Sequence, residues 1–132
     1  MVIAYGNHDR PADLDLLASL SSVHPIHVYA VPGVWHHPAG LGAVAVVPWL
    51  TGLAPTWQRG KSTATLRAME QVALGILLDK LGAELQAAPG EHLFLGHCML
   101  EGAIPGAGQP EQAGKEFVVR LGDLAQVPAA AF

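Results

Sequence analysis

Charged residues are scarce in this chain, and basic residues are the scarcer kind. Only 14% of its 132 residues are charged, and 7 Lys and Arg stand against 11 Asp and Glu, which gives a formal net charge of −4. A protein that binds DNA without sequence preference needs a basic surface that neutralises phosphates. The composition therefore argues against such binding by this chain alone. A contact with nucleic acid would need a metal site or other chain segments.

Cysteine and long apolar runs are also nearly absent. The single Cys98 excludes an internal disulfide bond and is typical of a reducing compartment. The apolar run at 42–50 is too short to span a bilayer and is broken by Pro48, and the first residues lack the basic segment of a secretory signal. We therefore expect a cytoplasmic protein.

Apolar residues, by contrast, make up 51% of the chain, which at this length predicts one globular domain with a modest core. Short apolar runs alternate with helical stretches, the pattern of an α/β fold. We expect strands at 2–5, 26–31, 42–50, 91–98 and 116–121, helices at 11–20 and 62–86, and a loop at 102–114.

The longest expected element is the helix at 62–86, whose N-terminus Ser62 or Thr63 would cap. Its apolar residues recur at helical spacing: Leu66, Met69, Val72, Ala73, Ile76, Leu77 and Leu81. The letters RGKST at 59–63 match the end of a phosphate-binding loop. Because Pro55 occupies the place of that loop's leading glycine, a capped helix start is the better interpretation.

The letters GNHD at 6–9 directly follow the first expected strand. Ligands of α/β sheets bind beyond the carboxyl ends of the strands, and Gly6 would allow a tight loop there. Asn7, His8 and Asp9 carry the amide, imidazole and carboxylate groups that metal-assisted hydrolases use. A turn that caps the following helix explains the same four residues, so both interpretations stay open on these letters alone.

A second Gly-His pair, Gly96 and His97, ends the strand expected at 91–98. With GNHDRP, IHVYAV, VAVVPWL, a long helix and LFLGHCMLEGAIPG in this order, the chain resembles the calcineurin-like metallophosphoesterases, most closely the SbcD-type DNA exonuclease subunit. The resemblance implies an α/β class and, more narrowly, part of a metallophosphoesterase α/β sandwich. It also implies metal-dependent phosphodiester hydrolysis in DNA repair and recombination.

The resemblance further assigns roles to four residues. Asn7 and His97 would be ligands of a pair of divalent ions, usually Mn²⁺, which activate a water for attack on the phosphodiester. His8 would be catalytic, stabilising the transition state or protonating the leaving oxygen, and Asp9 would orient His8. The implied partners are a DNA substrate, an SbcC-like coiled-coil ATPase subunit and a second copy of the chain.

Some motifs of that family have no counterpart here. An Asp-x-His and a Gly-Asp-x-x-Asp should precede GNHD, and a Gly-His-x-His should follow the last residues. We therefore expect residues 1–132 to form a partial metallophosphoesterase domain that lacks the first two and the last motifs, with an incomplete metal site and an uncovered sheet surface that favours association. GDLAQ at 122–126 imitates the second motif but is expected to be a turn.

Two further functions stay open. The chain could be a noncatalytic remnant or interaction module that keeps the fold without holding metal. It could also be a phosphoesterase that acts on a small phosphodiester or a phosphoprotein.

The remaining chemically active residues have simpler interpretations. His36 and His37 are expected in an exposed loop, and Cys98 as a small buried thiol rather than a nucleophile, because neighbours on a strand point to opposite faces. Trp49 and Trp57 could stack on bases, although packing in the core or under a lid is the better interpretation. Simple surface or strand-edge positions are expected for the other histidines: His24, His27 and His92.

Overall fold

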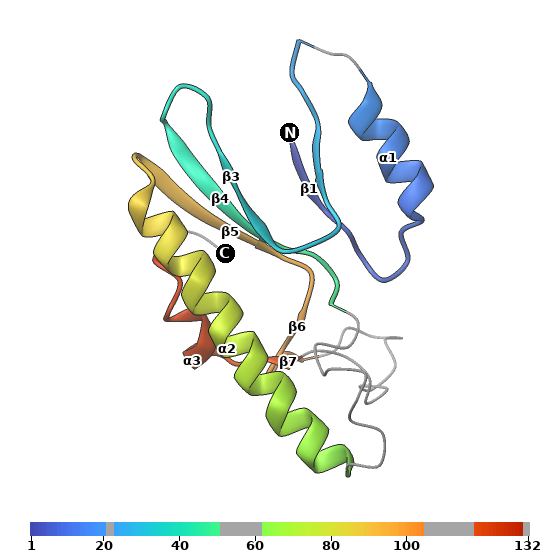
Figure 1. Cartoon of the computed structure of the whole chain (residues 1–132), viewed down its shortest axis with the longest axis vertical. Coiled ribbons are helices and arrows are strands. Elements are labelled where there is room, and N and C mark those ends of the chain that lie inside the picture. Colours follow the sequence, from blue (N-terminus) through green and yellow to red (C-terminus); the bar gives the residue numbers. More distant parts are fainter. Residues whose placement is uncertain (21–22, 51–61, 105–117, 131–132) are drawn as a thin grey trace.

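The computed structural model describes residues 1–20, 23–50, 62–104 and 118–130. Its elements follow in this order: β1 (Val2–Ala4), α1 (Pro11–Ser19), β2 (His27–Tyr29), β3 (Gly33–His36), β4 (Gly42–Val47), α2 (Thr63–Ala87), β5 (Glu91–Gly96), β6 (Met99–Leu100), β7 (Val118–Val119) and α3 (Leu121–Leu124). In Figure 1 the strands lie between α1 and the much longer helix α2. The expected α/β class is confirmed.

The central sheet has the strand order β3-β4-β5. β4 and β5 run parallel, with Ala45 opposite Phe94, and β3 lies antiparallel to β4 on the other side. Two smaller parallel pairs accompany this sheet, β1 with β2 and β6 with β7. Apolar residues in β4 explain its central place, since Ala45 and Val46 are fully buried.

The carboxyl ends of β1, β4 and β5 come together (Figure 1). Beyond the end of β4, the backbone N–H of Trp49 donates to the carbonyl oxygen of Tyr5 at 2.6 Å, which joins the end of β1 to the central sheet. The N–H of His97 donates to the carbonyl oxygen of Val47 at 2.9 Å and continues the pairing of β4 with β5. Segments more than 40 residues apart in the sequence therefore meet at one edge.

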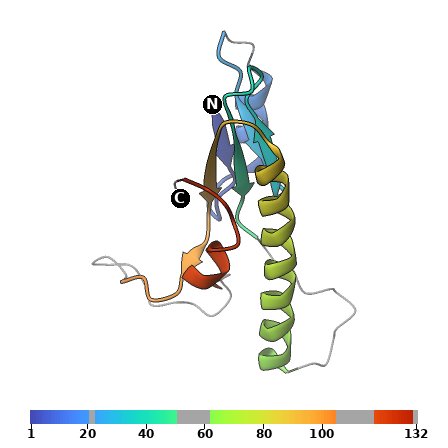
Figure 2. The ribbon, with the colours of Figure 1, turned by 90° about the vertical axis from the view of Figure 1, so that its left-hand side faces the viewer.

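Helix α2 covers one face of the central sheet, as Figure 2 shows from the side. It begins where the sequence predicts, because the Ser62 side chain accepts a hydrogen bond from the N–H of Thr65 at 3.2 Å. Its buried residues are Leu74, Leu78, Leu81, Gly82 and Leu85. They pack against Ala43, Ala45, Val47 and Phe94, which all point to the same face of the sheet.

The apolar residues of α2 extend beyond this buried face. Leu81 is buried and Leu77 packs at the margin of the core, but Val72 and Ile76 are 64% and 66% exposed. Apolar residues thus surround the helix, and only the sheet decides which of them are buried. Within the described ranges, no helix combines the length and apolar character needed to cross a membrane.

Two local expectations need correction, and one short strand was not expected. Residues 33–36 form strand β3, so His36 lies at a strand end rather than in a loop, although it is exposed as expected. Residues 99–100 form β6, which the sequence did not indicate. Of the letters GDLAQ, residues 122–124 belong to helix α3, which the Asp123 carboxylate caps by accepting a hydrogen bond from the N–H of Arg120 at 3.0 Å, and residues 125–126 form the turn that was expected.

Other expectations fall on residues outside the described ranges. These are Trp57, the stretch 59–61 of the phosphate-loop match, most of the loop expected at 102–114, and the first two residues of the strand expected at 116–121. Of its described remainder, Val118 and Val119 form β7, whereas Leu121 already begins helix α3.

The face of β5 that points away from α2 is open. Phe94 is buried under the helix, while its neighbours Leu93 and Leu95 are 44% and 37% exposed on the opposite face. At the adjoining edge, the N–H of Ala130 donates to the carbonyl oxygen of His92 at 2.8 Å. The last described residues thus line one edge of the strand, and its second face is left to solvent.

Candidate functional site

The GNHD segment at 6–9 and the pair Gly96-His97, together called the two Gly-His segments, meet at the ends of β1 and β5. A Cβ atom added to Gly6 would lie 2.8 Å from Cε1 and 2.9 Å from Nδ1 of the His97 ring. Real Cβ atoms do not approach other atoms this closely, so a side chain at position 6 would displace the imidazole. The observed position of the exposed His97 ring therefore requires a glycine at position 6, and His97 lies directly against the GNHD segment.

Asp9 turns back toward the same glycine. Its Oδ2 atom accepts a hydrogen bond from the N–H of Gly6 at 2.6 Å and lies 3.2 Å from the position of the missing Cβ. The N–H of Asp9 also donates to the carbonyl oxygen of Gly6 at 3.3 Å. Residues 6–9 thus form a closed turn. The Asp9 carboxylate and the His97 ring both lie next to Gly6.

This geometry differs from both sequence interpretations of Asp9. Among the described residues, no hydrogen bond joins Asp9 to His8, the partner that the family resemblance implies; the carboxylate binds Gly6 instead. The segment is a turn, but it does not cap α1, whose N-cap residue Arg10 makes no side-chain capping bond. Pro11 at the first helical position and Asp13 in the first turn favour the helix start instead.

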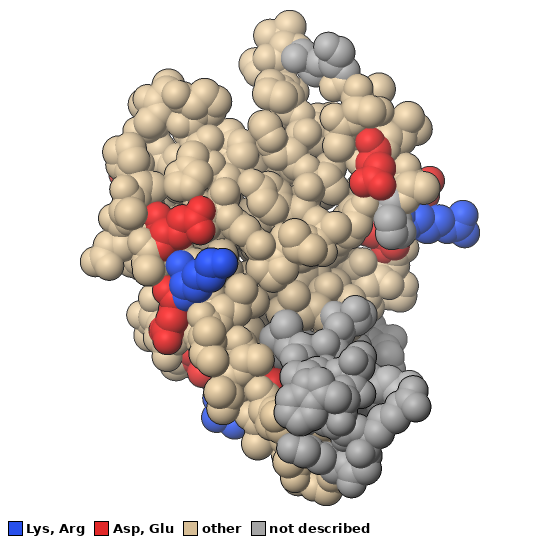
Figure 3. Space-filling view, in the orientation of Figure 1, with Lys and Arg blue, Asp and Glu red and all other residues tan. Residues whose placement is uncertain are grey.

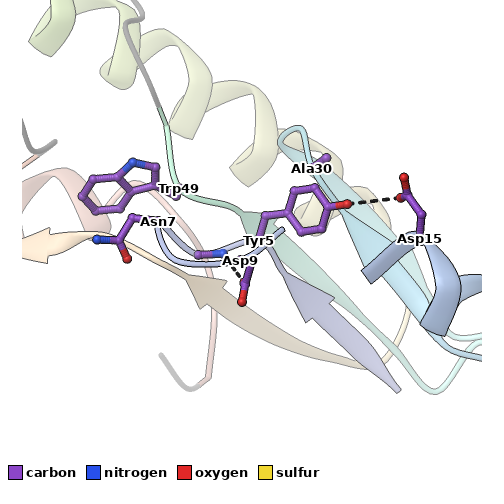
Figure 4. Close-up of a pocket in the computed structure, with 7 residues that line it drawn as sticks. Tyr5, Asn7, Asp9, Asp15, Ala30 and Trp49 are labelled. Atoms are coloured by element: carbon purple, nitrogen blue, oxygen red, sulfur yellow. Dashed lines mark hydrogen bonds between the residues drawn. The ribbon is translucent and has the colours of Figure 1, made fainter. Parts of the chain in front are cut away.

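Asn7 and His8 are both exposed at this edge. Asn7 lines an open pocket of about 520 Å³ that Figure 4 shows between the end of β1, helix α1 and Trp49. His8 is not among the described residues that line this pocket. The structure therefore places the GNHD turn and His97 at one edge, but Asn7 and Asp9 line the pocket whereas His97, like His8, is not among its described lining residues.

The pocket is acidic. It is lined by Tyr5, Gly6, Asn7, Asp9, Asp15, Ala30 and Trp49. Two of these described residues carry carboxylates and none is Lys or Arg. On the face drawn in Figure 3, the Lys and Arg side chains of the described residues form no broad patch and lie near Asp or Glu. An anionic ligand would be repelled here unless a cation accompanied it.

Tyr5 connects β1 to helix α1 across the pocket. Its hydroxyl donates to Oδ1 of Asp15 at 3.1 Å, as the dashed line in Figure 4 marks. Partial burial, followed by this hydrogen bond and the charge of Asp15, raises the pKa of Tyr5 above its ordinary 10.0. The phenol is therefore neutral across the physiological pH range and acts as a hydrogen-bond donor.

Trp49 and Cys98 flank His97. The Trp49 ring meets the His97 ring edge to face, with centroids 5.4 Å apart and planes at 87°. Cys98 is half-buried at the margin of the core, and burial raises the pKa of its thiol above 9.0. Because a thiol with a raised pKa is a poor nucleophile at neutral pH, the structural interpretation of Cys98 is the better one.

The donor atoms at this edge are too few to enclose a pair of metal ions. Within the described ranges, no three His, Cys, Asp or Glu side chains gather into a group that could hold a metal. Asn7 and His97 offer one amide and one imidazole, and the Asp9 carboxylate already binds the Gly6 backbone. A two-ion centre needs additional carboxylates that bridge and neutralise the ions.

Four other histidines have contacts elsewhere in the structure. His36 is 3.4 Å from Glu84 of α2, and His92 lies 3.2 and 3.0 Å from the carbonyl oxygens of Pro128 and Ala88. His27 and His37 both pack against Trp35, and their ring centroids lie 5.7 and 5.6 Å from the centroid of the Trp35 ring. These side chains have structural partners and do not extend the candidate site.

One contact was absent from the sequence interpretation, namely that of Gly6 with the His97 ring. A glycine after a short strand is a signal for close approach, but the letters do not say which distant residue approaches it. A comparison of the chain with models of protein families and with curated proteins finds no match.

Proposed function

We propose that this chain supplies part of a metal-dependent phosphodiesterase site, of the kind found in DNA exonucleases of repair and recombination, and that it is incomplete on its own. The observation that carries the proposal is the contact between Gly6 and the His97 ring. It places the GNHD turn and the second Gly-His pair at one sheet edge, as a shared metal site requires. The motif order that resembles the calcineurin-like metallophosphoesterases supports the same function.

The acidic pocket supports a role for metal. A phosphodiester is an anion, and the described lining of the pocket offers carboxylates and no basic group. Divalent cations would reverse the local charge, and Mn²⁺ is suited to a mixed set of oxygen and nitrogen ligands. In this proposal Asn7, on the wall of the pocket, and His97, beside the turn but not among the described lining residues, are two of the ligands. His8, exposed in the same turn, would reach a bound substrate.

The finer parts of the proposal follow from the missing ligands. Bridging carboxylates would come from polypeptide outside these 132 residues or from a second copy of the chain. The three described sheets would then be one part of an α/β sandwich. DNA as substrate and a coiled-coil ATPase as partner belong to this proposal by resemblance, and a cytoplasmic location belongs to it from the single cysteine and the short apolar runs.

A titration with Mn²⁺ tests the proposal. We expect the purified chain to bind Mn²⁺ weakly, and His97→Ala to remove that binding. His36→Ala is the matched control, because His36 is also exposed at a strand end but lies beside Glu84 on α2. Equal Mn²⁺ binding by the wild type and His97→Ala would contradict the proposal.

A nuclease assay tests the claim of incompleteness. The chain alone should not digest linear duplex DNA above the level of His8→Ala, because the ions lack bridging carboxylates. Metal-dependent digestion that His8→Ala abolishes would show that the site is complete, and would overturn this part of the proposal.

A noncatalytic interaction module is the second candidate. The observation that favours it is the open apolar face of β5, where Leu93 and Leu95 are 44% and 37% exposed. Exposed apolar surface of this kind marks sites of association. A chain that associates through this face and shows no difference in Mn²⁺ binding between the wild type and His97→Ala would favour the module over the phosphodiesterase.

A further inference from the structure

His92 joins three parts of the fold at the start of β5. It pairs with Ala43 in the register of β4 with β5, on the face of the sheet that α2 covers. Its Nε2 atom lies 3.0 Å from the carbonyl oxygen of Ala88 at the end of α2, and its Nδ1 atom lies 3.2 Å from the carbonyl oxygen of Pro128. Both ring nitrogens therefore face a backbone carbonyl.

This pair of partners favours one protonation state of the ring. A backbone carbonyl oxygen only accepts hydrogen bonds. A neutral imidazole has one N–H and one nitrogen lone pair, so it can donate to one of the two oxygens and turns a lone pair toward the other. The imidazolium form donates from both nitrogens. The observed geometry is thus satisfied in full only by the protonated ring.

The end of α2 favours the same state. Ala88 is the C-cap residue of this helix, whose last turn contains no basic residue. Carbonyl groups at a helix C-terminus lack partners within the helix and carry a partial negative charge. A positive ring at His92 supplies both a donor and a compensating charge at this point.

The titratable groups on the neighbouring elements have other places or partners. Glu91 of β5 is exposed, Glu84 of α2 lies beside His36, and Asp123 of α3 caps its own helix. Strand β4 contains no titratable side chain. In the described part of the chain none of these carboxylates forms an ion pair with His92. The two carbonyl oxygens are therefore the groups that respond to its proton.

His92 holds the last described residues of the chain. Up to Val127, which is 3% exposed, this stretch is fixed by packing in the core. Beyond it, Ala129 packs only at the margin of the core, and His92 bonds Pro128 through its ring and the N–H of Ala130 through its carbonyl oxygen, at 2.8 Å. Residues 128–130 thus depend on His92 far more than residues 124–127 do.

We propose that His92 is a pH-sensitive clamp. Its doubly protonated ring ties residues 128–130 to the end of α2 and the edge of β5, and loss of one ring proton loosens them. The clamp is closed at low pH and opens as the pH rises. Opening uncovers the edge of β5 beside the exposed Leu93 and Leu95. The device involves no metal and is independent of the proposed function.

An NMR titration of the full chain from about pH 5 to about pH 8, the range in which histidines commonly change charge, tests the clamp. At the acid end both ring nitrogens of His92 should show the ¹⁵N shifts of protonated nitrogens. As one proton is lost, hydrogen exchange at the Ala130 amide, corrected for its intrinsic pH dependence, should accelerate by about 10-fold. A neutral His92 ring with unchanged protection of the Ala130 amide would overturn the proposal.

Two substitutions separate His92 from other titrating groups. His92→Gln keeps an N–H donor but does not titrate in this range, so it should abolish the pH response of the Ala130 amide. His36→Gln is the matched control, because His36 also lies against α2, 3.4 Å from Glu84, and its loss should leave that response in place. A response that survives in His92→Gln, or disappears in His36→Gln, would contradict the clamp.

Discussion

The core under α2 and the edge where β1 and β5 end are built by opposite means. In the core, Leu78 and Leu85 of α2 and Ala45 of β4 have exposed fractions of 0–1%, so close packing holds them in place. At the edge, Asn7, His8 and Asp9 are all exposed, and a few directed contacts to Gly6 and Trp49 hold the arrangement. The difference indicates that close packing stabilises the α2-covered sheet, whereas the candidate site is a turn with little packing of its own.

The largest effect should come from the core. Leu78→Ala removes a fully buried side chain between α2 and the sheet and should lower the free energy of unfolding by about 2–5 kcal/mol. Ile76→Ala on the same helix is the control, because Ile76 is 66% exposed and its loss should change stability by less than about 0.5 kcal/mol. Urea unfolding followed by circular dichroism measures both, and similar losses would contradict the assigned buried face.

Gly6→Ala should produce the next largest effect and should act on the edge. The new Cβ would meet the His97 ring at less than 3 Å, so either the turn or the imidazole must shift, at a cost of about 1–3 kcal/mol. Mn²⁺ binding should fall together with stability. Gly75→Ala is the matched control, because nothing lies within 4 Å of its new Cβ and the change should stabilise α2 by up to about 1 kcal/mol. Unchanged stability and Mn²⁺ binding in Gly6→Ala would show that the His97 ring can move away from position 6 without cost.

A smaller effect is expected at the start of α2. Ser62→Ala removes the acceptor for the N–H of Thr65 and should destabilise the chain by about 1 kcal/mol. Ser62→Asp keeps an acceptor and should recover most of the loss. Because Ser62 lies outside the candidate site, the NMR signals of the His97 ring protons should not change. A change in these signals would contradict the separation between the α2 core and the edge that holds His97.

The smallest effect concerns pH and the Tyr5–Asp15 hydrogen bond. The pKa of Tyr5 is raised above 10.0 in the folded chain, so folding favours its neutral form. This contribution is fully present below about pH 10 and is lost as the pH rises through the folded-state pKa. Tyr5→Phe should therefore make the melting temperature fall less steeply above pH 10, as thermal unfolding across pH 8–11 would reveal. Identical slopes of melting temperature against pH in the wild type and Tyr5→Phe would show that the Tyr5–Asp15 hydrogen bond does not contribute to this pH dependence.

Much of the fold follows from local sequence. The strands β1, β4 and β5 coincide with short apolar runs, and Ser62 marks the start of α2. Strand β3 was not predicted, because Gly33–His36 is short and lies between Pro32 and Pro38. It also ends in the first residue of a His-His pair, which is typical of a loop. The sequence also did not predict which face of α2 is buried, because the exposed Val72 and Ile76 are as apolar as the leucines that the sheet covers.

The candidate site was only partly predictable. Strand ends followed by Gly-His indicate an edge where polar groups gather, and the described residues do bring Asn7, Asp9 and His97 to one edge. The contact of Asp9 with Gly6 depends on how a four-residue turn closes, which several conformations of the same letters allow. The contact of Gly6 with His97 joins residues 91 positions apart and depends on the whole sheet.

The most direct test of the account is paramagnetic broadening by Mn²⁺ in the full chain. Added at substoichiometric amounts, the ion should broaden the Asn7 side-chain amide and the His97 ring resonances together and leave those of His36 sharp. That result would place one ion between the two Gly-His segments. Broadening that centres on Asp13 of α1, with the His97 resonances unaffected, would contradict the claim that these segments form one metal site.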